Sequence, residues 1–387
     1  MKTTIIFLCI ALGLSLVFSY VFSEETAGWT KVSPLTLPEE RAKEFSMIPM
    51  GYVQDGLVIG YIDTSGNPFV MAYSVFTKRW DYMGENIITD AKVSDIYVAY
   101  DFELDGPDTC FIAFEDSAQK GKATVMACDD KEKRWKVFGE AGFTPDKMED
   151  FVFIDTSGGF RCAFLDSSRK PRLLQISSDD TWFELRDGEK DTISEDRASQ
   201  LALCESDRHG PIVAFADRKQ SDKVTVMEFK GSWQPLGNKG FSDGRINNLK
   251  IAGQYSRQSK RDRVFAAYSD WAHDKKLTVM YNENSSAQWL PLGGKGFTEG
   301  VPESLDIAVY KMVPFVAFAD KAHDGAATVM YYFKDAWRAA GKPGFSETGV
   351  TDIEIKFDGD TAYVGYITTD RTKHIEVWRM DVEEFFK

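Results

Sequence analysis

Two His-Asp pairs stand at the same place in two related segments, and imidazole beside carboxylate is a combination that can ligate a transition metal. DWAHD ends in His273-Asp274, and DKAHD ends in His323-Asp324. The simpler interpretation is that both are solvated hairpin tips copied by duplication. We therefore predict no metal site and keep the four residues as ligand-binding candidates. Trp271 is the fifth candidate, because a large ring at a loop tip either packs on the next segment or stacks on a sugar or a protein partner.

Other catalytic chemistry has a weak basis in the sequence. The segment from Asp101 to Asp108 places acids at alternate positions before a glycine, as calcium loops do, but lacks their terminal bidentate Glu. Phosphate-cradling glycine loops, Gly-x-Ser-x-Gly motifs and paired-His zinc motifs are absent. We expect no cofactor, with calcium as the alternative, and favour a protein that is not an enzyme. Glycoside cleavage stays open, because 60 acidic residues offer many carboxylate pairs.

The charge of the chain restricts its partners. Its 46 basic and 60 acidic residues give a net charge of −14, which repels nucleic acid and anionic lipid. We expect an extracellular protein or a glycan as the partner, no nucleic acid, and a monomer.

The N-terminus has the pattern of a secretory signal. A short basic start precedes an apolar run from Ile5 to Phe22, and a cleavage site fits just before Glu24. We predict residues 1–23 as a signal peptide, with an uncleaved signal anchor as the alternative because the run is nearly long enough to span a bilayer. Either form places the remaining chain in a secreted or surface location, with no other membrane insertion.

Four cysteines follow the signal segment, too few for a fold that depends on disulfides. Cys110 and Cys128 lie at the far ends of one predicted hairpin, so a bridge between them is geometrically possible. Buried free thiols explain them equally well. A Cys162–Cys204 bridge is left open in the same way.

An internal repeat of about 50 residues must position any site. Its clearest copies are PIVAFAD, VTVM and WQPLGNKGF in residues 211–241, VFAAYSD, LTVM and WLPLGGKGF in residues 264–297, and PFVAFAD, ATVM and WRAAGKPGF in residues 314–345. Seven tryptophans mark the period, at spacings of 51, 55, 47, 51, 56 and 48 residues: Trp29, Trp80, Trp135, Trp182, Trp233, Trp289 and Trp337.

The repeat predicts an all-β, seven-bladed β-propeller with four-stranded blades, formed by residues 24–387 as one domain. Its segments alternate apolar and polar residues and are separated by Gly, Asp, Ser and Lys-rich turns. The last copy, in residues 362–378, lacks a Trp unit, whereas GWTKV in residues 28–32 has one with no preceding copy. We therefore expect the N-terminal strand to complete the last blade and close the ring, a split that an open solenoid does not need.

The repeated residues have structural explanations. Each Trp is expected to bury its ring between neighbouring blades, and the Gly-Phe that follows it to supply a turn and an apolar plug. A repeated Asp ends the VAFAD-type strand, where a carboxylate can accept backbone N–H bonds in the hairpin. These residues are Asp63, Asp116, Asp166, Asp217, Asp270 and Asp320.

The VAFAD, ATVM, W-x-x-LG and GF pattern resembles tandem repeats of exported microbial proteins whose function is unassigned. The resemblance covers nearly all of the chain after the signal segment and implies a propeller and export, without an activity. The chain departs from better-known propeller classes, since it has no repeated Trp-Asp and no kelch-type Gly-Gly pair. Residues 177–182 approach the sialidase box but lack its Gly.

Three functions fit such a scaffold. The first is a secreted, non-catalytic binding scaffold for a protein partner, because propellers present two loop-bearing rims and no catalytic motif is found. The second is a lectin with a single carbohydrate site, since the hairpin tips differ too much for one sugar pocket per blade. The third is a glycoside hydrolase or lyase at the mouth of the channel, which needs acids that converge in space.

Overall fold

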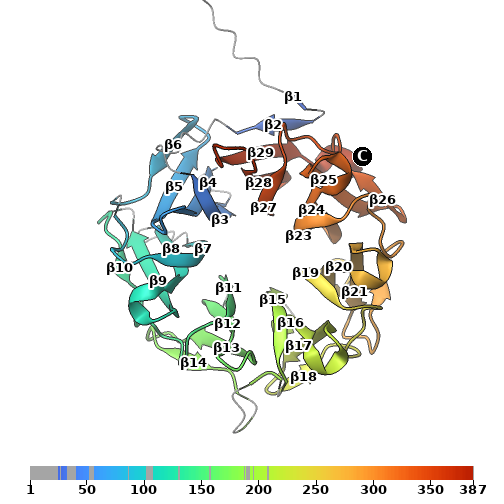
Figure 1. The fold of residues 1–387 in the computed structure, drawn as a ribbon, viewed down its shortest axis with the longest axis horizontal. Coiled ribbons are helices and arrows are strands. Elements are labelled where there is room, and N and C mark those ends of the chain that lie inside the picture. Colours follow the sequence, from blue (N-terminus) through green and yellow to red (C-terminus); the bar gives the residue numbers. More distant parts are fainter. Residues whose placement is uncertain are drawn as a thin grey trace, which may run out of the picture.

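Seven antiparallel sheets are arranged as blades around a central channel, as the sequence predicts (Figure 1). The computed structural model describes residues 25–26, 28–32, 41–51, 56–85, 87–101, 108–129, 131–156, 158–186, 188, 192–194, 196–206 and 209–386. The predicted signal segment and residues 102–107 of the acidic segment lie outside the described residues. Within those residues, no helix has the length and apolar character needed to cross a bilayer.

Blades 1 to 6 each contain four consecutive strands, beginning with β3, β7, β11, β15, β19 and β23 at the channel, and blade 7 contains β27, β28, β29, β2 and β1 in that spatial order. The strands are β1 (Glu25–Thr26), β2 (Trp29–Lys31), β3 (Ala42–Pro49), β4 (Gly56–Asp63), β5 (Pro68–Ser74), β6 (Arg79–Tyr82), β7 (Val93–Asp101), β8 (Thr109–Asp116), β9 (Lys122–Asp129), β10 (Lys136–Val137), β11 (Asp150–Ile154), β12 (Arg161–Leu165), β13 (Pro171–Ile176), β14 (Trp182–Glu184), β15 (Ala198–Ser206), β16 (His209–Asp217), β17 (Lys223–Phe229), β18 (Trp233–Pro235), β19 (Ile246–Ser256), β20 (Arg261–Asp270), β21 (Lys276–Glu283), β22 (Leu290–Pro291), β23 (Pro302–Tyr310), β24 (Val313–Asp320), β25 (Ala326–Phe333), β26 (Ala336–Ala339), β27 (Val350–Asp358), β28 (Thr361–Thr368) and β29 (Ile375–Asp381). The 3-10 turns are η1 (Ser117–Gln119), η2 (Arg218–Gln220), η3 (Trp271–His273), η4 (Lys321–His323) and η5 (Glu383–Phe386).

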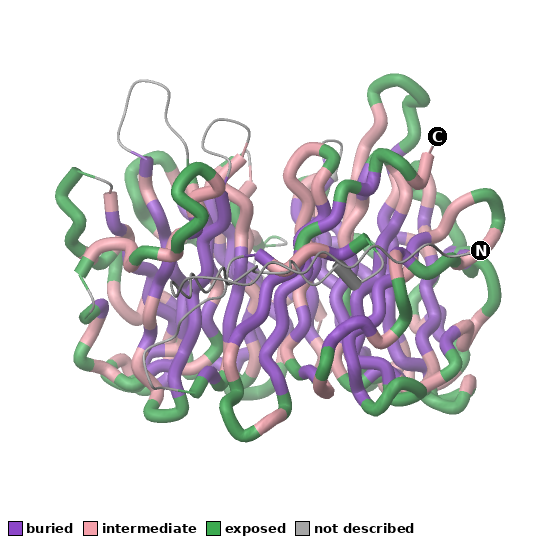
Figure 2. Tube along the Cα trace, turned by 90° about the horizontal axis from the view of Figure 1, so that it is seen from above, coloured by how far each residue is buried: buried purple, intermediate pink, exposed green. Residues whose placement is uncertain are grey.

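The second strand of each blade is buried on both sides, because a neighbouring blade covers each face of the sheet. All eight residues of β4 are buried, and so are seven of the eight in β24. A strand enclosed in this way is apolar almost throughout instead of alternating. Buried positions therefore follow the strands, and exposed positions gather in the turns at both ends of the ring (Figure 2).

Neighbouring blades are joined by a Trp, a Phe and a Gly from the repeat. The indole N–H of Trp289 donates to the Leu236 carbonyl of the preceding blade at 2.7 Å, and its ring stacks on Phe241 with centroids 4.5 Å apart. Gly237 has a φ of +74°, and a Cβ there would lie 2.8 Å from the Trp289 ring. The predicted burial is confirmed for Trp29, Trp233 and Trp289, whereas Trp80, Trp135, Trp182 and Trp337 are partly exposed. The predicted apolar plug is a stacking partner of the next blade's Trp.

The same contact recurs around the ring. Further indole N–H groups donate to a carbonyl of the preceding blade, from Trp135 to Met83 (3.1 Å), Trp233 to Leu185 (3.0 Å), Trp337 to Leu292 (2.8 Å) and Trp29 to Ala340 (2.7 Å). Trp182 differs: it stacks on Phe143 at 4.0 Å, but its N–H has no acceptor among the described residues.

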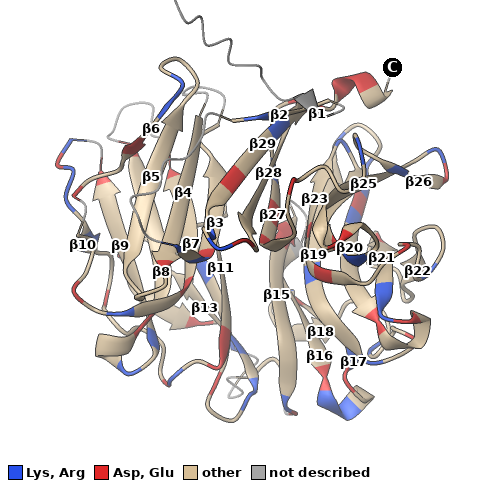
Figure 3. Ribbon diagram, turned by 45° about the horizontal axis from the view of Figure 1, so that its top comes forward, with Lys and Arg blue, Asp and Glu red and all other residues tan. Residues whose placement is uncertain are grey.

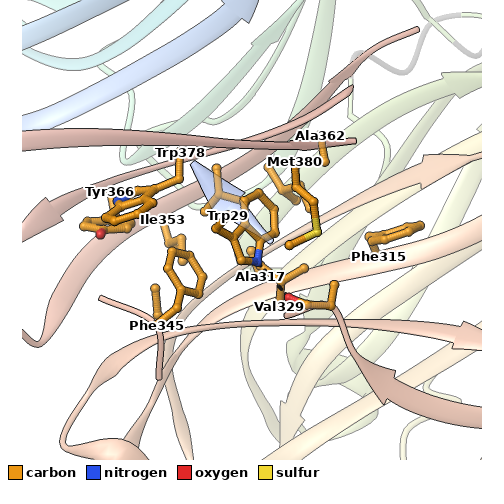
Figure 4. Close-up of a cluster of buried hydrophobic side chains, with 14 of the residues drawn as sticks. Trp29, Phe315, Ala317, Val329, Phe345, Ile353, Ala362, Tyr366, Trp378 and Met380 are labelled. Carbon is orange, nitrogen blue, oxygen red and sulfur yellow. Dashed lines mark hydrogen bonds between the residues drawn. The ribbon is translucent and has the colours of Figure 1, made fainter. Parts of the chain in front are cut away.

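The N-terminal strand closes the ring, as predicted. Strand β2 pairs with β29, so Thr30 stands opposite Arg379. Trp29 is fully buried, stacks on Phe345 of blade 6 with centroids 5.3 Å apart, and lies beside Met380 of blade 7 (Figure 4). The short strand β1 adds a fifth strand to this blade, which the repeat did not predict, because it pairs only with β2.

The repeated Asp residues organise the hairpins, as expected. In blades 2, 4, 5 and 6 the carboxylate caps the 3-10 turn, for example Asp217 Oδ1 accepting from the Lys219 N–H at 3.0 Å. In the shorter hairpins of blades 1 and 3, Asp63 and Asp166 each accept two backbone N–H groups. These carboxylates are buried, which fits a structural role within their own blades.

The four described cysteines, Cys110, Cys128, Cys162 and Cys204, are free and buried. Cys110 and Cys128 stand directly opposite each other on β8 and β9. Burial raises the pKa of both thiols. Cys162 and Cys204 lie on β12 and β15 of adjacent blades and belong to different core clusters.

Candidate functional site

The channel wall carries a ring of polar side chains, one near the start of each inner strand, and six of these strands have a β-bulge at or next to that position. The seven residues are Glu44, Asp95, Asp150, Gln200, Asn248, Ser304 and Asp352. Four of them, Asp95, Gln200, Asn248 and Asp352, have φ between 46° and 56°. The left-handed turn interrupts the pairing with the second strand, so backbone and side chain face the neighbouring blade.

Side-chain hydrogen bonds cross every interface between inner strands, at or next to this ring. Inner strands of adjacent blades do not share a ladder, so these bonds replace it. In ring order they are Asp95 N–H to Glu44 (2.7 Å), Tyr97 O–H to the Phe151 carbonyl (2.8 Å), Leu201 N–H to Asp150 (3.3 Å), Asn248 N–H to Gln200 (2.8 Å), Asn248 side-chain N–H to the Pro302 carbonyl (3.1 Å), Ile353 N–H to Ser304 (3.2 Å) and Phe45 N–H to Asp352 (2.8 Å).

Carboxyl groups in the channel have raised pKa values. Burial, aided by Glu44 and Asp150, raises the pKa of Asp95 to about 6. Burial, aided by Glu354 and Glu44, raises the pKa of Asp352 to about 7. Because these acids stand close together in a confined space, the last of them to ionise does so against both desolvation and repulsion.

A cation balances part of this charge deeper in the channel. Lys356 Nζ lies 3.7 Å from Asp306 and 3.6 Å from Glu354, and these carboxylates raise the pKa of Lys356 although burial lowers it. Asp306 and Glu354 also accept the N–H groups of Ile355 and Met47. The wider part of the channel has a volume of about 650 Å³. Asp306 and Glu354 therefore serve mainly to join blades.

A second cavity opens on the face of the ring that carries η1 to η4, which we call the cap face. Its volume is about 430 Å³, and it lies between the hairpins of blades 3, 4 and 5. Four guanidinium groups line it: Arg169 from the β12–β13 hairpin, Arg197 before β15, Arg218 in η2 and Arg245 before β19. We call this cavity the arginine pocket. Blue ribbon in Figure 3 marks basic residues in the hairpin after β16.

The remaining lining of the arginine pocket is mostly polar. Ser199, Gln200 and Asn247 contribute hydroxyl and amide groups, and Asp222 contributes the carboxylate among the described lining residues. Asp222 pairs with Arg218 at 2.8 Å. Arg169 and Arg197 form no ion pair with a described residue. Within the described part of the chain, the guanidinium N–H groups of Arg169 and Arg197 thus have no acidic partner.

The sequence candidate Trp271 forms one edge of the arginine pocket and is 37% exposed. It does not bury its ring in the next blade. The guanidinium carbon of Arg245 lies 3.4 Å from the ring centroid, and Lys275 Nζ lies 4.0 Å from it. Cation–π attraction holds these charges on the ring, so the exposed aromatic surface is already in use.

The two His-Asp pairs, in contrast, do not converge on one site. His323 Nδ1 lies 2.8 Å from the Asp320 carboxylate of the same hairpin, whereas His273 Nε2 lies 2.7 Å from the Asp243 carboxylate. Asp274 and Asp324 end their 3-10 turns with φ of 55°, a backbone role. None of the four residues of the two His-Asp pairs belongs to the described lining of the arginine pocket.

One group of possible metal ligands occurs among the described residues: Asp243, Asp270 and His273, with ligand atoms within 4.8 Å of one another. Lys295 Nζ already lies 2.8 Å from both oxygens of Asp243. The hydrogen bond from Lys295 is the main cause that lowers the pKa of Asp243, and the hydrogen bond with His273 is the second. An ammonium group thus takes the place that a cation would need, and we assign no metal to this group.

Sequence reasoning missed both the ring of channel residues and the arginine pocket. The ring was detectable, because its members follow the repeat at spacings of 51, 55, 50, 48, 56 and 48 residues. Their differing side chains concealed that period. The arginine pocket had a weaker signal: Arg197 and Arg245 share a repeat position that is basic in five blades, whereas Arg169 and Arg218 belong to hairpins of two different blades.

Comparisons with known proteins identify the fold alone. No protein-family model matches the sequence, and no curated protein matches it. A fucose-specific lectin from Aleuria aurantia superposes with a TM-score of 0.52 and 11% identity, over 81% of this chain and 100% of that one. Lectin BP39L from Burkholderia pseudomallei gives 0.58 and 14%, over 89% and 97%. The polysaccharide lyase Uly1 gives 0.53 and 7%, over 90% and 91%.

Proposed function

We propose that this protein is a carbohydrate-binding propeller with a single site, the arginine pocket. The observation that carries the proposal is the composition of that pocket, which combines four guanidinium groups with hydroxyl and amide side chains. Sugars are recognised through arrays of hydroxyl and charged oxygens, which such forked and planar donors match. A volume of about 430 Å³ falls within the usual range of small-ligand sites.

Two observations favour a glycan over a protein partner. The described lining of the arginine pocket is more polar than apolar, so it offers hydroxyl, amide and guanidinium groups to a ligand that carries many oxygen atoms. Among the solved structures of similar fold are a fucose-specific lectin and lectin BP39L. The carbohydrate alternative therefore takes precedence over the protein-partner hypothesis.

The pocket also favours binding over catalysis. Guanidinium groups keep their protons at all ordinary pH values, so they cannot act as general bases. The described lining contains no His, Lys or Tyr, and Asp222 is held by Arg218. We place this binding outside the cytoplasm, on the basis of the predicted signal segment.

A glycan array followed by titration calorimetry tests the proposal. We expect one group of related glycans to bind and Arg245→Ala to weaken that binding about tenfold, the typical loss for a charge-assisted hydrogen bond. Arg371→Ala, in the β28–β29 hairpin of blade 7, is the matched control, because it removes an exposed Arg from the same face. An array without hits, or equal loss in both variants, contradicts a site at this pocket.

Glycan cleavage in the channel is a second candidate, favoured by the raised pKa values of Asp95 and Asp352. A polysaccharide lyase is also among the structures of similar fold. Incubation with polysaccharides, followed by measurement of new reducing ends, tests this alternative. Activity that is lost in Asp95→Asn while glycan binding persists would establish it over simple binding.

A further inference from the structure

We infer that the carbohydrate is anionic, carrying carboxylate or sulfate groups, and that it is a polymer crossing the cap face. This inference rests on the proposed function, because it specifies the ligand class of the same pocket. The net charge of the molecule is −14 and would repel an anionic ligand, so the attraction must come from the local charge of the pocket.

The first support is the local charge of the arginine pocket. Four guanidinium groups face one carboxylate among the described lining residues. Arg218 uses Asp222 as a partner, whereas Arg169 and Arg197 have no ion-pair partner among the described residues. Like charges gathered on an acidic protein repel one another without a ligand, and an anion placed between them relieves that repulsion.

The second support is a basic residue at one position of five successive blades, three residues before the polar residue of the channel ring. Blades 1 to 5 carry Arg41, Lys92, Lys147, Arg197 and Arg245 there, all exposed. Their backbones are fixed by the neighbouring hairpin: the carbonyls of Arg41, Lys92, Arg197 and Arg245 accept the N–H groups of Thr64, Ser117, Arg218 and Trp271 at 3.0–3.1 Å.

These five positions follow an arc around the mouth of the channel, because equivalent positions of successive blades lie on a ring. The arc stops where Val301 and Gly349 replace the basic residue in blades 6 and 7. Two of its members, Arg197 and Arg245, line the arginine pocket. A chain with repeated negative charges can therefore contact the pocket and continue along the arc, which a single monosaccharide cannot do.

The third support concerns Trp271. A neutral sugar is usually held by stacking its apolar face on an aromatic ring. Arg245 and Lys275 lie against the Trp271 ring at 3.4 and 4.0 Å from its centroid, so these cations compete for that surface. The ring instead orients two charges at the edge of the pocket.

Matched pairs of oligosaccharides test the ligand class. The purified protein is titrated with an oligogalacturonate and its methyl ester, and with a sulfated galactan oligosaccharide and its desulfated form. We expect the charged member of at least one pair to bind tenfold or more tightly, and to lose affinity as salt concentration rises. The pair that shows the difference distinguishes carboxylate from sulfate recognition.

Variants assign the effect to the pocket and the arc. Arg197→Ala should weaken binding of the charged oligosaccharide about tenfold, and Lys147→Ala should weaken binding of a long chain more than that of a disaccharide. Arg371→Ala should leave both unchanged. These side chains are exposed, and unchanged circular dichroism excludes loss of fold as the cause.

The remaining outcomes separate this inference from the proposed function. Equal binding of charged and neutral members, without salt dependence, overturns the anionic ligand and leaves carbohydrate binding intact. Binding of an acidic peptide at the pocket in preference to every oligosaccharide overturns both. Equal binding of single-stranded DNA of matched charge also overturns the inference, because it would reduce recognition to charge alone.

Discussion

At the residue scale, the repeated Trp contributes through three contacts that depend on each other. Its indole N–H needs the carbonyl of the preceding blade, its ring needs the Phe of the Gly-Phe unit, and its approach needs a glycine without a Cβ. Stability is thus concentrated in a few buried residues, while the exposed aromatic Trp271 belongs to the arginine pocket.

Replacing Trp289 by Ala is expected to lower the free energy of unfolding by about 3–5 kcal/mol, the usual cost of truncating a buried Trp. It also leaves the Leu236 carbonyl without its donor. Urea unfolding measures the change. Trp271→Ala is the control and should alter stability by about 0.5 kcal/mol or less, since the ring is 37% exposed. Similar losses in both variants would contradict this distinction.

Asp352 predicts a pH dependence. Burial raises the pKa of this carboxyl group to about 7 in the folded protein, whereas its pKa in the unfolded chain is about 4. The folded state therefore holds the proton more tightly, and ionisation destabilises it increasingly from about pH 4 to about pH 7. Asp352→Asn keeps an acceptor for the Phe45 N–H and removes this charge.

We expect Asp352→Asn to raise the free energy of unfolding at about pH 8, and the gain to shrink toward zero by about pH 4. Denaturant unfolding of both proteins across this range measures it. A gain that does not vary with pH would indicate that the carboxylate is not desolvated.

At the scale of elements, strand β2 joins the two ends of the chain. It pairs with β29, and its Trp29 contacts blade 6 through Ala340 and Phe345. Blade 7 without β2 would expose β29 as an edge strand and leave a cavity between blades 6 and 7.

A chain that starts at Ser33 should therefore lose at least the roughly 3–5 kcal/mol of a buried Trp. Thermal unfolding measures the loss. A synthetic peptide of residues 25–32 should restore part of it, and the same peptide with Ala at the position of Trp29 should not. Equal rescue by both peptides would show that Trp29 is not the closing contact.

At the scale of the whole molecule, the net charge and the charge of the arginine pocket have opposite signs. A net charge of −14 destabilises the folded state by self-repulsion, which salt screens. The same salt weakens attraction between the pocket and an anionic chain.

We therefore expect the melting temperature to rise with sodium chloride while the affinity for a charged oligosaccharide falls. Thermal unfolding and calorimetry in the same series of buffers provide the two measurements. Sodium sulfate should be avoided, since sulfate can itself occupy the arginine pocket. An affinity that rises with salt would contradict an electrostatic basis for binding.

The scaffold could be predicted from the sequence alone. The seven tryptophans, the VAFAD-type strands and the unpaired GWTKV segment predicted the blade number and closure by the N-terminus, and the structure confirms both. This was possible because every blade must satisfy the same packing and hydrogen-bonding demands, so the same residue types return at one period. The glycine and Asp roles followed from local turn chemistry in the same way.

Only the tertiary structure located the candidate site. Trp271 was a sequence candidate, but its neighbours Arg169, Arg197 and Arg218 are 102, 74 and 53 residues earlier in the chain. Closing the ring brings hairpins of three blades together, and a ligand site in such a place requires no repetition. His273 and His323 illustrate the converse: equal positions in the repeat, yet different partners, because the residue opposite each differs. Local patterns determine how each blade forms, whereas the juxtaposition of unlike loops depends on the closed ring.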